Sequence, residues 1–157
     1  FAIHVESNLD LNQFASQTGL VAFASIPPNA NDMKSKVDLG MDRVLDQAAE
    51  VLGLSMQDFE CRVEVFPTDV ALKKKLDDLF GIKKGDRAVY FHREYPAFYY
   101  HATNTIYLSL ESASLGVIGH EMTHALISKY FVVPPTERIQ EILAGYVEFS
   151  LKKSQPQ

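Results

Sequence analysis

Apolar residues recur at steps of three and four through the segment 31–53, with charged residues between them, which is the pattern of an amphipathic helix. The apolar positions are Met33, Val37, Met41, Val44, Leu45, Ala48, Val51 and Leu52. Asn31 or Asp32 can cap the start of this helix, and Gly53 can end it. The pattern predicts one long helix that packs against the core through a single face.

Several shorter segments alternate apolar and polar residues or are rich in Val, Ile, Tyr and Phe, which predicts strands. We expect strands at residues 2–5, 62–66, 88–92, 97–101 and 105–110. The last two flank Ala102, Thr103 and Asn104, and a turn at these residues would join them as a hairpin. The strands together predict a small mixed sheet.

Polar caps and proline breakers predict further helices. The predicted helices cover residues 11–17, 68–80, 114–130 and 136–152. Thr68, Ser114 and Thr136 can cap the last three of them. Pro134 and Pro135 separate the last two, and because this connection is short the two helices should form an antiparallel hairpin.

The order of these elements, a long helix, then strands with a short helix, then two helices, is that of an α+β fold. No repeat or linker interrupts residues 1–157, so we expect a single domain. Residues 1–30 carry the weakest pattern, and Pro27 with Pro28 breaks any regular element there. Residues 153–157 should form a frayed tail.

The composition is that of a globular protein, with 46% apolar and 22% charged residues. A formal net charge of −5 makes nucleic acid a poor partner, and no apolar run is long enough for a transmembrane segment. The single cysteine, Cys61, excludes a disulfide framework and a cysteine-rich zinc site. We therefore expect a soluble protein, and because the chain starts at Phe1, export after removal of a signal peptide stays open and no compartment is assigned.

The main chemical signal is the segment HEMTH at residues 120–124. Histidines four residues apart on a helix lie one turn apart on the same face, so the imidazoles of His120 and His124 can bind one metal ion. Glu121 lies about 100° further round the helix, which suits a base acting on a metal-bound water better than a ligand. Apolar residues surround the segment, and unpaired polar groups on a buried helix would be costly.

A catalytic zinc ion takes three protein ligands and leaves one position for water. Glu141 is our candidate for the third ligand, because it is a carboxylate within an apolar run on the next helix. The small residues Ala144 and Gly145 would let that helix approach the helix of the two histidines closely. Glu137 and Glu148 lie on nearly the same stripe and are weaker candidates.

An HExxH segment followed by a glutamate on the next helix resembles the gluzincins, the thermolysin-like branch of the zincin metallopeptidases. The likeness covers roughly residues 88–150 and includes the stretch from Thr105 to Ser109 before the motif and Glu141-x-x-Ala144-x-Tyr146 after it. These stretches are similar to small single-domain gluzincins. The resemblance implies a zincin-like fold, a Zn²⁺ cofactor and the hydrolysis of peptide bonds.

The resemblance also implies where a peptide or protein substrate binds. The strand from Ala97 to His101 would form the upper rim of the cleft, and an extended peptide would pair with it. A histidine or tyrosine often steadies the oxyanion in this class. The candidates are Tyr99, Tyr100, His101 and Tyr146, of which we place His101 and Tyr146 in the catalytic set.

We therefore expect a zinc-dependent peptide-bond hydrolase in which Glu121 activates a zinc-bound water. One departure from the family keeps an alternative open: thermolysin-like enzymes have an aspartate four residues after the third ligand, where this chain has Gly145. The group that orients His120 would then be a water or a backbone carbonyl. The alternative is a catalytically silent zinc-binding module that acts in protein interaction. A latent form also stays open, in which residues 1–30 or a further domain regulate the cleft.

Overall fold

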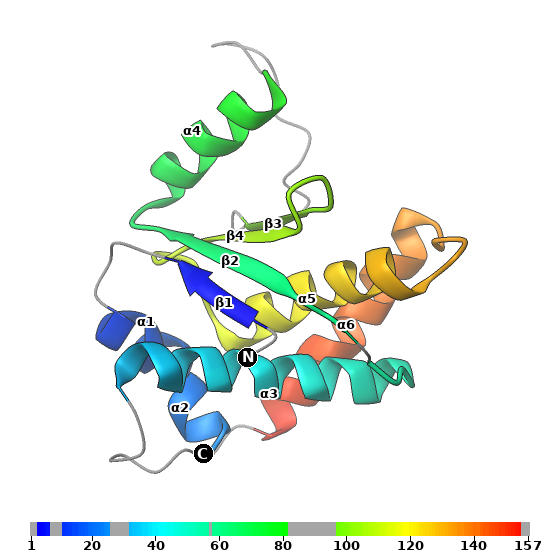
Figure 1. The fold of residues 1–157 in the computed structure, drawn as a ribbon, viewed down its shortest axis with the longest axis horizontal. Helices are drawn as coiled ribbons and strands as arrows, with labels where there is room; N and C mark the ends of the chain where they lie inside the picture. Colours follow the sequence, from blue (N-terminus) through cyan, green and yellow to red (C-terminus); the bar gives the residue numbers. More distant parts are fainter. Residues whose placement is uncertain (1–2, 7–10, 26–31, 57, 82–96, 155–157) are drawn as a thin grey trace.

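The computed structural model describes residues 3–6, 11–25, 32–56, 58–81 and 97–154. Within them the chain forms six helices and a four-stranded sheet (Figure 1). In chain order the elements are β1 (Ile3–Glu6), α1 (Leu11–Thr18), α2 (Leu20–Phe23), α3 (Met33–Leu52), β2 (Cys61–Phe66), α4 (Asp69–Phe80), β3 (Ala97–Tyr100), β4 (Thr105–Ser109), α5 (Leu115–Tyr130) and α6 (Glu137–Ser154). The predicted α+β class is therefore confirmed.

The sheet is mixed, with the strand order β1-β2-β4-β3. β2 is parallel to both β1 and β4, whereas β3 runs antiparallel to β4 in the predicted hairpin and pairs Phe98 with Tyr107. Among the described strands, β3 lies at an edge of the sheet and contacts α5. A strand at an edge presents backbone N–H and C=O groups that no neighbouring strand uses.

The two faces of the sheet carry different helices. α3, α5 and α6 pack on one face, and α4 lies over the other (Figure 1). Successive residues of a strand point to opposite faces, so Ile106 and Leu108 enter the larger core while Tyr107 packs with Leu72 and Leu76 of α4. The helices that carry the HEMTH segment and Glu141 therefore rest on the larger core.

Several helix ends follow caps that the sequence predicts. The side chain of Asp32 accepts a hydrogen bond of 2.8 Å from the backbone N–H of Ser35, so Asp32 caps α3. Thr68 and Ser114 accept in the same way at the starts of α4 and α5. Gly53 ends α3 in the left-handed region, with φ of 69°.

Some predicted boundaries differ from those observed. β1 includes Glu6, one residue beyond the predicted strand. α6 continues to Ser154, past its predicted end near residue 152. The strand expected at residues 88–92 lies outside the described residues. None of the helices in the described part of the chain has the length and apolar character that spanning a bilayer requires.

α5 and α6 pack side by side in opposite directions, as their short connection predicts (Figure 1). The residue that allows their close approach is Gly119 on α5, where an added Cβ would lie 2.2 Å from Leu151 Cδ1 and 3.1 Å from Val147 Cγ1. Ala144 is buried, but a Cβ added at Gly145 would meet nothing within 4 Å. The role predicted for Gly145 in this approach is therefore wrong.

Candidate metal centre

The HEMTH segment lies in the middle of α5, which is buried over most of its length. Because apolar neighbours fix this helix, His120 and Glu121 are only 2% and 6% exposed. The Nε2 atoms of His120 and His124 face each other at 3.3 Å, and the ring centroids are 5.0 Å apart. The two imidazoles therefore share one face of the helix, as their spacing predicts.

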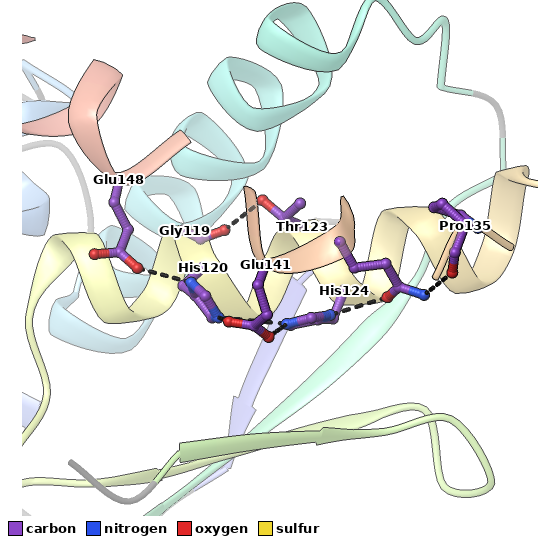
Figure 2. A network of polar contacts seen from close by, with 8 residues as sticks. Gly119, His120, Thr123, His124, Pro135, Glu141 and Glu148 are labelled. Carbon is purple, nitrogen blue, oxygen red and sulfur yellow. Dashed lines mark hydrogen bonds and ion pairs between the residues drawn. The ribbon is translucent and has the colours of Figure 1, made fainter. Parts of the chain in front are cut away.

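α6 brings a carboxylate to the same point (Figure 2). Glu141 Oε1 lies 2.9 Å from Nε2 of His124, and Glu141 Oε2 lies 3.1 Å from Nε2 of His120. One ligand atom from each of the three residues lies within 4.8 Å of the other two. Glu141 thus occupies the position at which the sequence places a third ligand.

The three groups are of the types that Zn²⁺ binds in catalytic sites, two imidazoles and a carboxylate. Two nitrogen atoms bound at ~2.0–2.1 Å to one tetrahedral ion lie about 3.3 Å apart. The two histidine Nε2 atoms are separated by 3.3 Å here. The residues present therefore fit a zinc ion in both chemistry and spacing.

Glu148 lies behind His120, at the opposite ring nitrogen from Glu141 (Figure 2). Its Oε1 is 2.7 Å from His120 Nδ1, a close charge contact whose angle is not that of a hydrogen bond. A carboxylate at this position orients a ligating histidine and raises its basicity. Besides the predicted water or backbone carbonyl, the carboxylate of Glu148 is therefore a candidate for the group that orients His120. Glu148 follows Glu141 by seven residues, about two helical turns, which is the sequence signal that could have identified it.

His124 has a different support, the side-chain amide of Gln140, which the sequence analysis did not single out. Gln140 Oε1 is 3.1 Å from His124 Nδ1, and its Nε2 donates to the carbonyl of Pro135 at 3.1 Å. A carbonyl can only accept, so the amide nitrogen must face Pro135 and the amide oxygen must face the histidine. Nδ1 of His124 then carries the proton, which leaves Nε2 free to bind a metal.

Glu121 is buried beside the three grouped residues. Burial raises the pKa of its carboxyl, whereas the neighbouring His124 and His120 act in the opposite direction. A hydrogen bond from the backbone N–H of Tyr99 on β3 also reaches this carboxylate. A raised pKa suits a group that takes up a proton and releases it again within one reaction cycle.

These groups face a cleft of about 540 Å³ between α5, α6, β3 and the loop from α5 to α6. Besides the two histidines, Glu121 and Glu141, the lining residues are Ala97, Phe98, Tyr99, His101, Ile127, Ser128, Phe131, Val132, Pro134, Glu137 and Gln140. None of the described residues before position 31 lines the cleft. The latent form in which residues 1–30 fill the cleft therefore gains no support.

Two of the four predicted oxyanion candidates lie at the cleft. Tyr99 and His101 line it. Tyr146 does not: it is 62% exposed on the outward side of α6, so the prediction that it belongs to the catalytic set is wrong. Tyr100 packs against Phe80 of α4, on the far face of the sheet.

Comparisons with known proteins yield no relative of this chain. No protein-family model matches it, no curated protein matches it, and no solved structure matches it. The resemblance to the gluzincins therefore rests on the residues of the motif and stays a prediction.

Proposed function

We propose that this protein is a zinc-dependent hydrolase of peptide bonds with a gluzincin-like site. One observation carries the proposal: Nε2 of His120, Nε2 of His124 and the carboxylate of Glu141 converge at an open cleft, with Glu121 buried beside them. Three ligands and a neighbouring base are the set that metal-assisted hydrolysis requires.

The residues around the site divide into those that bind and those that orient. His120, His124 and Glu141 would hold the ion, while Glu148 and Gln140 fix the two imidazoles from behind. When bound, Zn²⁺ supplies Lewis acidity, which lowers the pKa of a water toward ~7 and polarises a carbonyl. Orientation from behind matters because each imidazole must keep its proton on Nδ1 and present Nε2.

Glu121 moves the proton. It accepts a proton from the attacking water and delivers it to the amine that leaves. Burial favours this role, since the raised pKa of the carboxyl brings its proton affinity closer to the pH at which the enzyme would work. His101, which lines the cleft, is the side chain that would donate to the oxyanion, because the hydroxyl of Tyr99 donates to Asn104 Oδ1 at 3.0 Å.

The substrate would lie along β3. The N–H of Tyr99 reaches the Glu121 carboxylate and so points away from the paired strand β4. The edge of β3 that β4 does not use is thereby on the same side as the catalytic base. An extended peptide can add to such an edge through backbone hydrogen bonds, which would place its carbonyl beside the metal ligands.

A zinc-binding module without turnover is the alternative that the sequence leaves open, and Gly145 is the feature that favours it. The structure supplies a carboxylate for His120 from Glu148 instead. Because the missing aspartate has a substitute, its absence no longer favours a silent site, and hydrolysis is the better reading of the geometry.

The metal can be tested first. We expect about one zinc per purified chain, measured by elemental analysis. Glu141→Ala should lower zinc affinity by about a hundredfold or more, because loss of a ligand exceeds the ~10–100-fold cost of losing an outer partner. Glu137→Ala removes a carboxylate that lines the cleft outside the ligand group and should retain the metal. Unchanged zinc affinity in Glu141→Ala would refute the site.

The chemistry can be tested separately from the metal. Glu121→Gln keeps the shape of the side chain but removes the base, so zinc content should stay near wild type while cleavage of a mixed peptide library falls about 10²–10⁴-fold. Glu50→Gln, at an exposed position on α3, is the matched control and should cleave like wild type. Zinc-loaded wild-type protein that cleaves no peptide of the library would favour the binding module.

A further inference from the structure

The outward side of α6 is apolar, although it lies opposite the core. The inward residues Ala144, Val147 and Leu151 are fully buried, as in any amphipathic helix. On the opposite side, large apolar side chains are between 47 and 62% exposed, and we call them the outer stripe: Ile139, Ile142, Tyr146 and Phe149. Single exposed apolar residues are ordinary, but a contiguous group of them marks an interaction surface.

Apolar residues outside α6 extend this surface. Val51 on α3 lines a depression of about 520 Å³ together with two residues of the outer stripe. In the loop before α6, Val133 is 82% exposed, and Val132, which is 98% exposed, also lines the cleft of the candidate metal centre. Apart from Val70 on α4, every large apolar side chain that the described part of the chain exposes belongs to the outer stripe, this loop or Val51.

The charged residues of α6 are partly sorted by side: Arg138 and Lys153 lie with the outer stripe, whereas Lys152 lies about 20° from the direction of Glu141. At about 100° per residue, Arg138, Lys152 and Lys153 lie within about 80° of Ile142 in the outer stripe. The carboxylates of the helix lie about 100° or more from Ile142, toward the cleft, and they are Glu137, Glu141 and Glu148. Lys153 Nζ lies 5.2 Å from the centre of the Phe149 ring. The outward side therefore combines apolar groups with cations.

From this arrangement we propose that the outer stripe docks α6 onto an anionic lipid surface, a property separate from the zinc chemistry. A helix with aromatic and aliphatic groups on one face and Lys or Arg beside them lies in the plane of a bilayer interface. The apolar groups enter the interface, and Arg138 at one end with Lys152 and Lys153 at the other would meet anionic headgroups. Long lysine side chains can cover apolar surface while their ammonium groups stay among the headgroups.

A second copy of the chain fits the outer stripe less well. Because Arg138 lies at one end and Lys152 and Lys153 at the other, a twofold helix pair of either direction brings cations of the two copies together. The stripe from Ile139 to Phe149 spans about 15 Å of helix. That length is small for the roughly 800 Å² that each partner of a stable complex buries.

Protruding side chains also favour a fluid surface over a shaped protein partner. Val133, in the loop before α6, is 82% exposed. Val51 is preceded by Glu50, a carboxylate at an exposed position of α3. Arg138, Lys152 and Lys153 outnumber this carboxylate, so an anionic surface is the occupant that the charges select.

Co-sedimentation with vesicles tests the proposal on the full chain. Wild-type protein should bind vesicles of equal parts phosphatidylcholine and phosphatidylglycerol, and binding should weaken as salt rises. Lys152→Gln and Lys153→Gln should each lower partitioning about fivefold, and Ile142→Glu should lower it further because it places a charge in the interface. Val70→Glu, an exposed valine on α4, is the matched control and should bind like wild type.

Three results would overturn the proposal. The first is no binding by wild type, and the second is equal binding to vesicles of phosphatidylcholine alone. The third is a wild-type dimer in sedimentation velocity that Ile142→Glu dissociates, because the stripe would then serve a second copy. Should circular dichroism show that Ile142→Glu does not fold, Lys152→Gln and Lys153→Gln, both at exposed positions, decide the outcome.

Discussion

The two histidines of the candidate centre are supported by chemically different groups. His120 has the carboxylate of Glu148 at Nδ1, and His124 has the amide oxygen of Gln140 there. A carboxylate draws the Nδ1 proton more strongly than a neutral amide does and makes the other nitrogen a better donor. His120 should therefore be the stronger nitrogen ligand of the pair.

This asymmetry can be measured with Glu148→Gln, which keeps the side-chain shape and removes the charge. We expect zinc affinity to fall about 10–100-fold, measured by competition with a chromophoric chelator. Urea unfolding of the metal-free protein serves as the control and should change little if Glu148 acts through the metal ligand. An unchanged zinc affinity would mean that Glu148 does not orient His120.

At the scale of elements, the contact between α5 and α6 depends on the missing side chain of Gly119. Gly119→Ala would place a Cβ 2.2 Å from Leu151 Cδ1 and 3.1 Å from Val147 Cγ1. We expect it to lower the free energy of unfolding by about 1–3 kcal/mol, as overpacked cores do, measured by urea denaturation.

Gly145→Ala is the matched control for this substitution. It also replaces a glycine inside a helix, but its Cβ would meet nothing within 4 Å. Helix propensity alone should then raise the free energy of unfolding by up to about 1 kcal/mol. If both variants shift stability in the same direction, the close approach at Gly119 does not limit the packing of the two helices.

Local features of these elements could be predicted because their causes are local. Asp32, Thr68 and Ser114 cap helices through backbone groups three residues ahead, so the sequence contains both partners. The placement of His120 and His124 on one face follows from helical geometry in the same way. The position of Glu141 beside the histidines could be predicted because a buried carboxylate in an apolar run needs a partner.

Features that depend on how one helix rotates against another could not be predicted in full. Gly119 receiving Leu151 sets the rotation of α6, and that rotation turns Glu148 toward His120. The outward direction of Tyr146 follows from the sequence, since five residues at about 100° each put it about 140° round the helix from Glu141. Two side chains so far apart on one helix do not face the same cleft.

At the scale of the whole molecule, a metal held between α5 and α6 should stabilise the fold. An ion that binds only the folded chain contributes about 4 kcal/mol at a free concentration a thousand times its Kd. We expect a chelator to lower the Tm of zinc-loaded wild type by several degrees, measured by scanning calorimetry. The chelator should change the Tm of Glu141→Ala much less. A wild-type Tm that stays the same when the chelator is added would contradict a resident metal.

His124 and Glu141 are 17 positions apart in the chain, so an ion held by both acts as a removable cross-link that closes the turn between the helices. A disulfide restricts mainly the unfolded chain, whereas this cross-link exists only when the fold presents its ligands. The enclosed turn includes Pro135, whose carbonyl accepts from Gln140. A displacement of the turn would therefore act on His124 through the side-chain amide of Gln140. Opening the turn would then release the ion at the same time.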